Sequence, residues 1–177
     1  MKRVNGTGFT LVEMLFCVWI LSILAILVIS GFRAMKRSMD SMEEQYQADM
    51  LAGKLLEFIT EEIRYSRYLS IEHSEDEALS IQISYTSDSY GRDTILKIDT
   101  SEADGTWGYL TILCGGTREY RPYESLYGHL RMGPLDDGTP VFQKDSHEKC
   151  IVVSFGICNE TGEVKAIVED VHIRLLN

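Results

Sequence analysis

The stretch FTLVEMLFCVWILSILAILVISGF, residues 9–32, decides the architecture of this chain, because its only charged side chain is Glu13. At about 1.5 Å per residue, a helix of this length is about 36 Å long and covers the roughly 30 Å hydrocarbon core of a bilayer. A carboxylate in such a helix costs about 2.5–3.5 kcal/mol on insertion scales, so Glu13 requires a partner or access to the headgroups. The sequence predicts a membrane-spanning helix with one functional carboxylate near its start.

The residues before this stretch point to processing. The segment KRVNGTGFTLVE, residues 2–13, places Gly8 immediately before Phe9, ahead of the apolar region, whereas an ordinary secretory signal is cut after it. This segment resembles the class III signal of type IV prepilins and pseudopilins. The resemblance covers the first third of the chain. It implies a prepilin peptidase that recognises Gly8, Thr10, Leu11 and Val12, cuts between Gly8 and Phe9, and then N-methylates Phe9.

Cleavage before the apolar helix leaves that helix on the mature protein. A peptidase at the cytoplasmic face requires the leader, residues 1–8, to lie inside, which sends everything after Phe32 outside. Basic residues on both sides of the span leave the positive-inside rule undecided. We therefore expect a single-pass protein of the cytoplasmic membrane that later enters a cell-surface or envelope-spanning filament.

The resemblance also implies a role for Glu13 in assembly. After cleavage, the new α-amine of Phe9 lies about one helical turn away, and each neighbouring subunit carries an equivalent amine. An intermolecular pair between packed helices fixes their axial register, because a mismatched neighbour leaves buried charges unpaired at about 3–5 kcal/mol. The expected partners are other pilins or pseudopilins, bound through this helix, and the assembly platform in the membrane.

Residues 33–70 change to an amphipathic pattern that continues the helix. Apolar residues recur at intervals of three to five, including Met35, Met39, Met42, Tyr46, Leu55 and Ile63. We expect this stripe to pack against a sheet, within a helix that runs from Phe9 to about Tyr68.

Residues 71–177 are expected to form one exported, β-rich globular domain. Alternating or strongly apolar runs predict strands near residues 79–85, 94–99, 107–114, 151–157 and 170–175. Turn residues separate them near 90–92, 103–105, 136–138 and 160–162. The predicted fold is α+β and pilin-like, with the long helix on a mostly antiparallel sheet and the least regular stretch at 115–149.

Composition and cysteines limit other functions. The formal charge of −10 disfavours nucleic-acid binding through a broad basic surface, although a local patch stays open. The residues that would form this patch are Arg64, Arg67, Arg118, Arg121 and Arg131. A disulfide among Cys114, Cys150 and Cys158 is open as well; a Cys150–Cys158 bridge requires a turn near Gly156.

Catalytic and cofactor motifs are not recognised. The four histidines lack metal-site spacing, and no Ser/His/Asp set or phosphate loop is evident, so we expect neither a metal, a cofactor nor an enzyme. Asp136-Asp137-Gly138 and the sequon-like Asn159-Glu160-Thr161 are interpreted as turns.

These patterns favour a structural subunit, a minor pilin or pseudopilin, that assembles into a type IV pilus-like or secretion pseudopilus filament. Two alternatives remain. One is a subunit of a DNA-uptake pilus that binds nucleic acid. The other is a membrane-anchored exported domain whose N-terminus is not cut.

Overall fold

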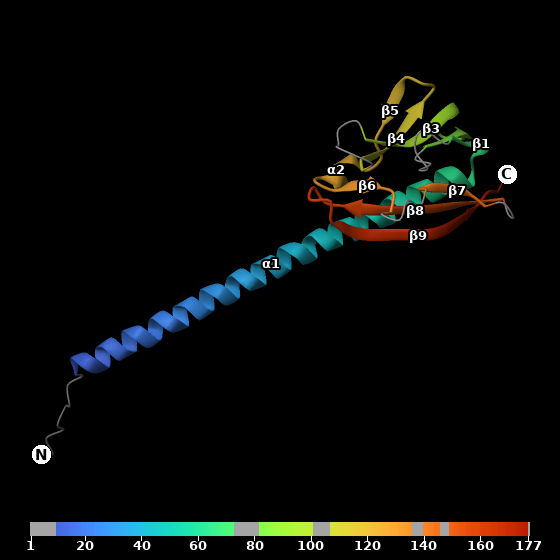
Figure 1. Ribbon diagram of the computed structural model, residues 1–177. Coiled ribbons are helices and arrows are strands. Elements are labelled where there is room, and N and C mark those ends of the chain that lie inside the picture. The colour runs from blue at the N-terminus through green and yellow to red at the C-terminus, as the bar shows by residue number, and fades with distance from the viewer. Residues whose placement is uncertain (1–9, 73–81, 101–106, 136–139, 146–148, 177) are drawn as a thin grey trace, which may run out of the picture. The chain divides into compact units, whose positions relative to one another are not determined.

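The computed structural model describes residues 10–72, 82–100, 107–135, 140–145 and 149–176 (Figure 1). The chain divides into two compact units, residues 1–43 and 44–177. Helix α1 runs from Leu11 to Arg64. Its residues up to Glu43 belong to the first unit, and its residues from Glu44 onward belong to the second. No proline occurs before residue 122, so nothing removes a backbone donor from this helix.

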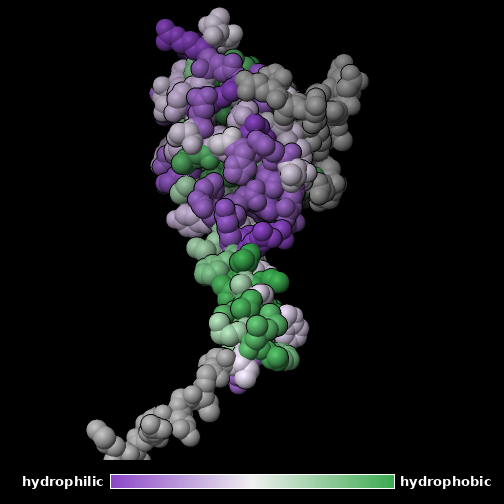
Figure 2. Space-filling model, turned by 90° about the vertical axis from the view of Figure 1, so that its left-hand side faces the viewer, coloured by the Kyte–Doolittle hydropathy of each residue, from purple (hydrophilic) through white to green (hydrophobic). Residues whose placement is uncertain are grey.

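The first unit presents its side chains outward. All described residues from Thr10 to Glu43 are exposed, and the apolar part of α1 is long enough to cross a membrane. Figure 2 shows apolar residues gathered along this part of the chain, while the visible face of the second unit is mainly hydrophilic. An exposed helix of this kind fits a membrane span by length and composition.

Helix α1 ends at Arg64, six residues before the expected end of the amphipathic segment at residue 70. Ser66 stops it, because its backbone N–H and its hydroxyl both donate to the Ile63 carbonyl, at 3.1 and 2.7 Å. The Arg64 carbonyl accepts from the Leu176 N–H at 3.1 Å. Strand β1, Arg67–Glu72, follows at once, so the last predicted turn of helix is a strand instead.

The second unit contains two antiparallel sheets where we expected one. The first has the order β1-β2-β3-β4-β5. Its further strands are β2, Gln82–Ser87; β3, Gly91–Asp99; β4, Tyr109–Cys114; and β5, Arg118–Tyr120. Buried and partly buried residues alternate along β2, as in a strand with one face on a core.

The second sheet is built around one long strand. Its strands are β6, Arg131–Gly133; β7, Phe142–Lys144; β8, Cys150–Cys158; and β9, Val164–Arg174. Strand β9 pairs along β8, whereas β6 and β7 pair with different segments of β8. The short helix α2, Glu124–Tyr127, precedes β6. Figure 1 shows these strands, orange to red, in a different part of the domain from β1–β5.

One hydrophobic core joins the helix to both sheets. The buried residues of α1 begin only at Ala48, and the expected packing residues Met35, Met39, Met42 and Tyr46 are all exposed. That part of our prediction was wrong, because the apolar stripe extends along α1 beyond the residues that enter the core. The core itself includes Leu51, Leu55, Ile59 and Ile63 of α1 with Ile83, Leu96, Ile112, Val153 and Phe155 of the strands.

Gly108 connects the two sheets through a close backbone contact. Its N–H and carbonyl exchange hydrogen bonds with Met132 at 2.7 and 2.8 Å. A Cβ at this position would lie 2.0 Å from the Asp99 carbonyl oxygen. Only glycine therefore allows the chain to bridge β4 and β6 here.

Candidate functional site

The candidate assembly site lies at the first turn of α1, where Thr10 and Glu13 form a reciprocal pair. The Thr10 N–H and hydroxyl both donate to Glu13 Oε2 at 2.9 Å, and the Glu13 N–H donates to Thr10 Oγ1 at 3.4 Å. This is a capping box, in which two side chains satisfy backbone donors that a helix start otherwise leaves open. Our sequence interpretation missed it, although a threonine three residues before a glutamate is its recognised pattern.

The capping box occupies only one oxygen of the carboxylate. Glu13 Oε1 has no hydrogen-bond partner among the described residues, and it projects from a helix with no other charge before Arg33. The predicted recognition residues Leu11 and Val12 are 78% and 58% exposed. Gly8 and Phe9, the predicted cleavage and methylation residues, lie outside the described residues, as does the rest of the leader.

An apolar surface continues from this turn. Val12, Leu15, Phe16 and Trp19 line an open hollow of about 490 Å³ on one face of α1. Their spacing of three, one and three residues places them side by side on a helix. This face presents apolar side chains next to the carboxylate, which suits a neighbouring apolar helix or lipid.

A second polar cluster lies where α1 enters the domain, around Glu44. Its Oε1 accepts from Asn159 Nδ2 at 3.1 Å and lies 3.2 Å from His129 Nε2, while Oε2 lies 3.0 Å from Lys165 Nζ. The hydrogen bonds from Lys165 and Asn159 lower the pKa of the Glu44 carboxyl. Lys165 also pairs with Glu163 at 2.8 Å. These contacts fix the start of the domain's helix against the turn between β8 and β9.

The sequon-like segment is part of that turn, as predicted. Asn159 is 8% exposed, and its Oδ1 accepts from the N–H and hydroxyl of Thr161 and from the Glu163 N–H. Because its amide nitrogen also contacts Glu44, both ends of the side chain are engaged in the fold. This geometry is that of a structural Asx turn and not of an accessible glycan acceptor.

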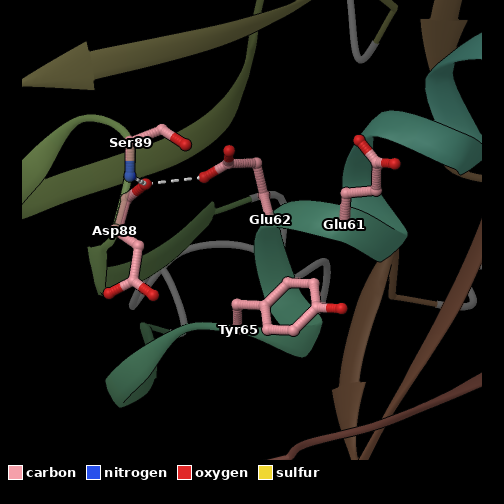
Figure 3. Close-up of a pocket in the computed structure, with 6 residues that line it drawn as sticks. Glu61, Glu62, Tyr65, Asp88 and Ser89 are labelled. Atoms are coloured by element: carbon pink, nitrogen blue, oxygen red, sulfur yellow. Dashed lines mark hydrogen bonds between the residues drawn. The ribbon is translucent and has the colours of Figure 1, made fainter.

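The acidic pocket in Figure 3 lies between the last turns of α1 and the turn that follows β2. It has a volume of about 350 Å³ and is lined by Glu61, Glu62, Tyr65, Ser87, Asp88 and Ser89. Glu62 extends toward the turn (Figure 3). It accepts from Ser87 Oγ at 2.8 Å and from Tyr85 Oη at 3.2 Å. Burial, and then the Glu62 charge, raise the pKa of Tyr85, which keeps its hydroxyl a donor. The described residues contain no group of three metal-ligating side chains.

The five arginines that would form a basic patch lie on different parts of the domain, and Arg64 is the last residue of α1. Arg67 lies on β1 and Arg118 on β5, the two edge strands of the first sheet. Arg121 and Arg131 both lie over the Tyr109 ring, with Cζ at 4.9 and 4.5 Å from its centroid. Arg121 also pairs with Asp99 at 3.2 Å, and Arg131 donates to two backbone carbonyls. These two arginines thus stabilise the fold locally.

The cysteines are present as thiols, with no disulfide among the described residues. Strand β8 runs unbroken from Cys150 to Cys158, so these two residues lie at its opposite ends, without the turn near Gly156 that a bridge between them requires. Cys114 ends β4 in the other sheet. Burial raises the pKa of its thiol, which makes it less reactive.

Comparison with protein-family models, with curated proteins and with solved structures finds no match to this chain.

Proposed function

We propose that this chain is a structural subunit of a filament, a minor pilin or pseudopilin. In this proposal prepilin peptidase cuts between Gly8 and Phe9 and methylates the new terminus. The apolar helix first holds the subunit in the cytoplasmic membrane, with residues 33–177 outside. The assembly platform then transfers it into a type IV pilus-like or secretion pseudopilus filament. Its role is assembly and not catalysis.

One observation carries this proposal: a single carboxylate in the first turn of an otherwise uncharged membrane-length helix. Thr10 engages Oε2 of Glu13, while Oε1 has no partner among the described residues. A capping box therefore leaves room for a second, charged partner. The α-amine that cleavage creates at Phe9, on this or a neighbouring subunit, is the partner that the proposal supplies.

A second candidate function is that of a membrane anchor for the exported domain, with no cleavage and no assembly. The capping box favours it, because local hydrogen bonds to Thr10 give Glu13 a structural role that needs no neighbour. The two functions differ in whether the negative charge of Glu13 is needed.

A pair of substitutions separates the two functions. Glutamine also serves at this position of a capping box, so Glu13→Gln keeps the cap and removes the charge, whereas Glu13→Ala removes both. We expect both variants to be processed but to enter filaments poorly, measured as the fraction of subunit in sheared filaments from the native host. Incorporation of Glu13→Gln at the wild-type level would show that Glu13 only caps the helix, and would overturn its assembly role.

A further inference from the structure

At the end of the apolar run, one face of α1 carries an open hollow whose lining changes from apolar to basic. Its volume is about 440 Å³, and it is lined by Ile26, Ile29, Ser30, Arg33, Ala34 and Arg37. The two isoleucines are 67% and 53% exposed, and both arginines are exposed as well. The lining residues follow one another at intervals of three and one, so a single helix face presents apolar side chains and then two guanidinium groups.

Arg33 and Arg37 form the polar end of this hollow. They are four residues apart, about 6 Å along the helix axis, and like charges at this spacing on one helix face repel. Neither makes an ion pair with any residue that the structure describes. The Ser30 hydroxyl already donates to the Leu27 carbonyl at 2.9 Å. An anion between the two guanidinium groups would relieve their repulsion and accept hydrogen bonds from both.

The position of the hollow selects the source of that anion. Residues 9–32 form an apolar run of about 36 Å, so the two arginines directly follow the segment that fits the roughly 30 Å hydrocarbon core. A free phosphate or an acidic side chain would contact the arginines and leave the isoleucines uncovered. A phospholipid matches both parts in the same order, because its acyl chain lies in the hydrocarbon and its phosphate lies at the boundary.

We propose that this hollow binds one anionic phospholipid, from the leaflet at the C-terminal end of the span. One acyl chain lies along Ile26 and Ile29, and the phosphate lies between Arg33 and Arg37. A zwitterionic headgroup fits less well, because it brings a cationic group toward the two guanidinium groups. Lys36 does not line the hollow, so it contributes only the general attraction of a basic segment for anionic lipid.

This inference rests on the membrane span, which belongs to the proposed function and also to the anchor alternative. It requires neither cleavage nor assembly. A lipid held at both ends, by its chain and by its phosphate, fixes the depth and the rotation of the helix in the bilayer. In the proposed function, the subunit releases this lipid when the helix leaves the membrane.

Quenching by brominated lipids tests the site in the full-length chain in vesicles. Ile29→Trp in a Trp19→Phe background places an indole in the hollow. The background chain alone gives the signal of Trp107, the other tryptophan. The vesicles contain equal amounts of phosphatidylglycerol and phosphatidylcholine, with bromine on the acyl chains of one or the other. We expect brominated phosphatidylglycerol to quench the introduced indole several-fold more strongly; equal quenching would overturn the site.

Matched variants separate a site from general electrostatic attraction. Val28→Trp places the indole about 140° around the helix from Arg33, and we expect both lipids to quench it equally. Arg33→Gln and Arg37→Gln, each alone, should lower the preference at Ile29→Trp several-fold. Lys36→Gln removes the same charge next to the hollow and should leave most of the preference. An equal loss in Lys36→Gln, or an equal preference at Val28→Trp, would show attraction without a site.

Excess inorganic phosphate, with a chloride control of matched ionic strength, identifies the source of the anion. We expect the ratio of quenching by the two lipids to stay at its value in chloride. A ratio that falls to that of Arg33→Gln would show that the arginines bind free phosphate in place of the lipid, and would overturn the proposal.

The same measurement keeps this inference separate from the proposed function. Equal quenching of Ile29→Trp by both brominated lipids would refute the lipid site and leave the membrane span intact. Quenching by neither lipid would show that residue 29 lies outside the hydrocarbon. That result would refute the span, and with it both the lipid site and the proposed function.

Discussion

At the scale of single residues, Glu13 caps the start of α1, and the proposed filament function assigns it a second role in assembly. It completes the capping box with Thr10, which stabilises the first turn of α1 without any partner chain. In the proposed function, it also places a negative charge where helices of neighbouring subunits meet. Thr10-Leu11-Val12-Glu13 thus caps a helix that begins at Leu11, and in the proposed function the same carboxylate pairs with the α-amine of a processed subunit.

The pH dependence of stability follows from Glu44. Because its partners lower the pKa of the folded carboxyl below the ordinary 4.5, its stabilising effect is complete above about pH 4.5 and is lost as the pH falls through the folded value. We expect Glu44→Gln to unfold at lower temperature than wild type at pH 7, by an amount that shrinks toward pH 3.

Circular dichroism melts of the detergent-solubilised chain measure this difference. Glu57→Gln is the matched control, because the one ion pair of Glu57 among the described residues is an exposed pair with Lys54. We expect the control to melt close to wild type throughout. A Glu44→Gln deficit that stays constant from pH 7 to pH 3 would contradict the assignment.

Gly108 provides a test of the contact between the sheets. In Gly108→Ala the new Cβ would lie 2.0 Å from the Asp99 carbonyl oxygen, so the backbone has to shift, and we expect a loss of about 1–3 kcal/mol in the free energy of unfolding. Gly53→Ala meets nothing within 4 Å and lies inside α1, so we expect a gain of about 0.5–1 kcal/mol. Denaturant unfolding measures the free energy of unfolding of both variants. A Gly108→Ala variant as stable as the wild type would contradict the close approach of Gly108 to the Asp99 carbonyl.

At the scale of elements, the sequence predicted the regular parts of the structure best. The α+β class, the long helix and antiparallel strands near 94–99, 107–114 and 151–157 are confirmed. The apolar residues of each of these elements follow a single period, that of a helix or that of a strand, over the whole predicted segment. The division into two sheets was not predicted, because it depends on three-residue strands such as β6 and β7, which are too short to show a period.

The boundaries of the amphipathic segment show a different limit of sequence reasoning. An amphipathic pattern shows that a helix face is apolar, but it does not say what covers that face. The stripe was assigned to the core, yet burial begins only at Ala48.

At the candidate site, the importance of Glu13 was predicted from its cost in an apolar run, whereas its hydrogen bonds to Thr10 were overlooked. The strands predicted around residue 80 extend into residues outside the described ranges.

Strand β8 leads to a prediction about the thiols. Because Cys150 and Cys158 lie at opposite ends of β8 and Cys114 lies in the other sheet, we expect no intrachain disulfide even after export. Alkylation of the denatured, unreduced protein should modify all four cysteines, counted by intact mass. A reduced control gives the full count. Two fewer adducts without reductant would contradict this arrangement.

At the scale of the whole molecule, the two units have different chemistry. Residues 1–43 contain the apolar helix and the exposed stripe, and residues 44–177 contain the common core of the helix and both sheets. The proposed function gives each unit one task. The first anchors and assembles, and the second presents a folded, acidic domain outside the cytoplasmic membrane.

The intact mass of the membrane-bound chain, produced with and without an active prepilin peptidase, tests the filament proposal most directly. We expect the peptidase to remove residues 1–8 and leave a chain that begins at Phe9, methylated in the native host. A peptidase-inactive strain provides the uncut reference. A chain that still begins at Met1 beside an active peptidase would contradict processing, and would leave a membrane-anchored domain whose Glu13 only caps its helix.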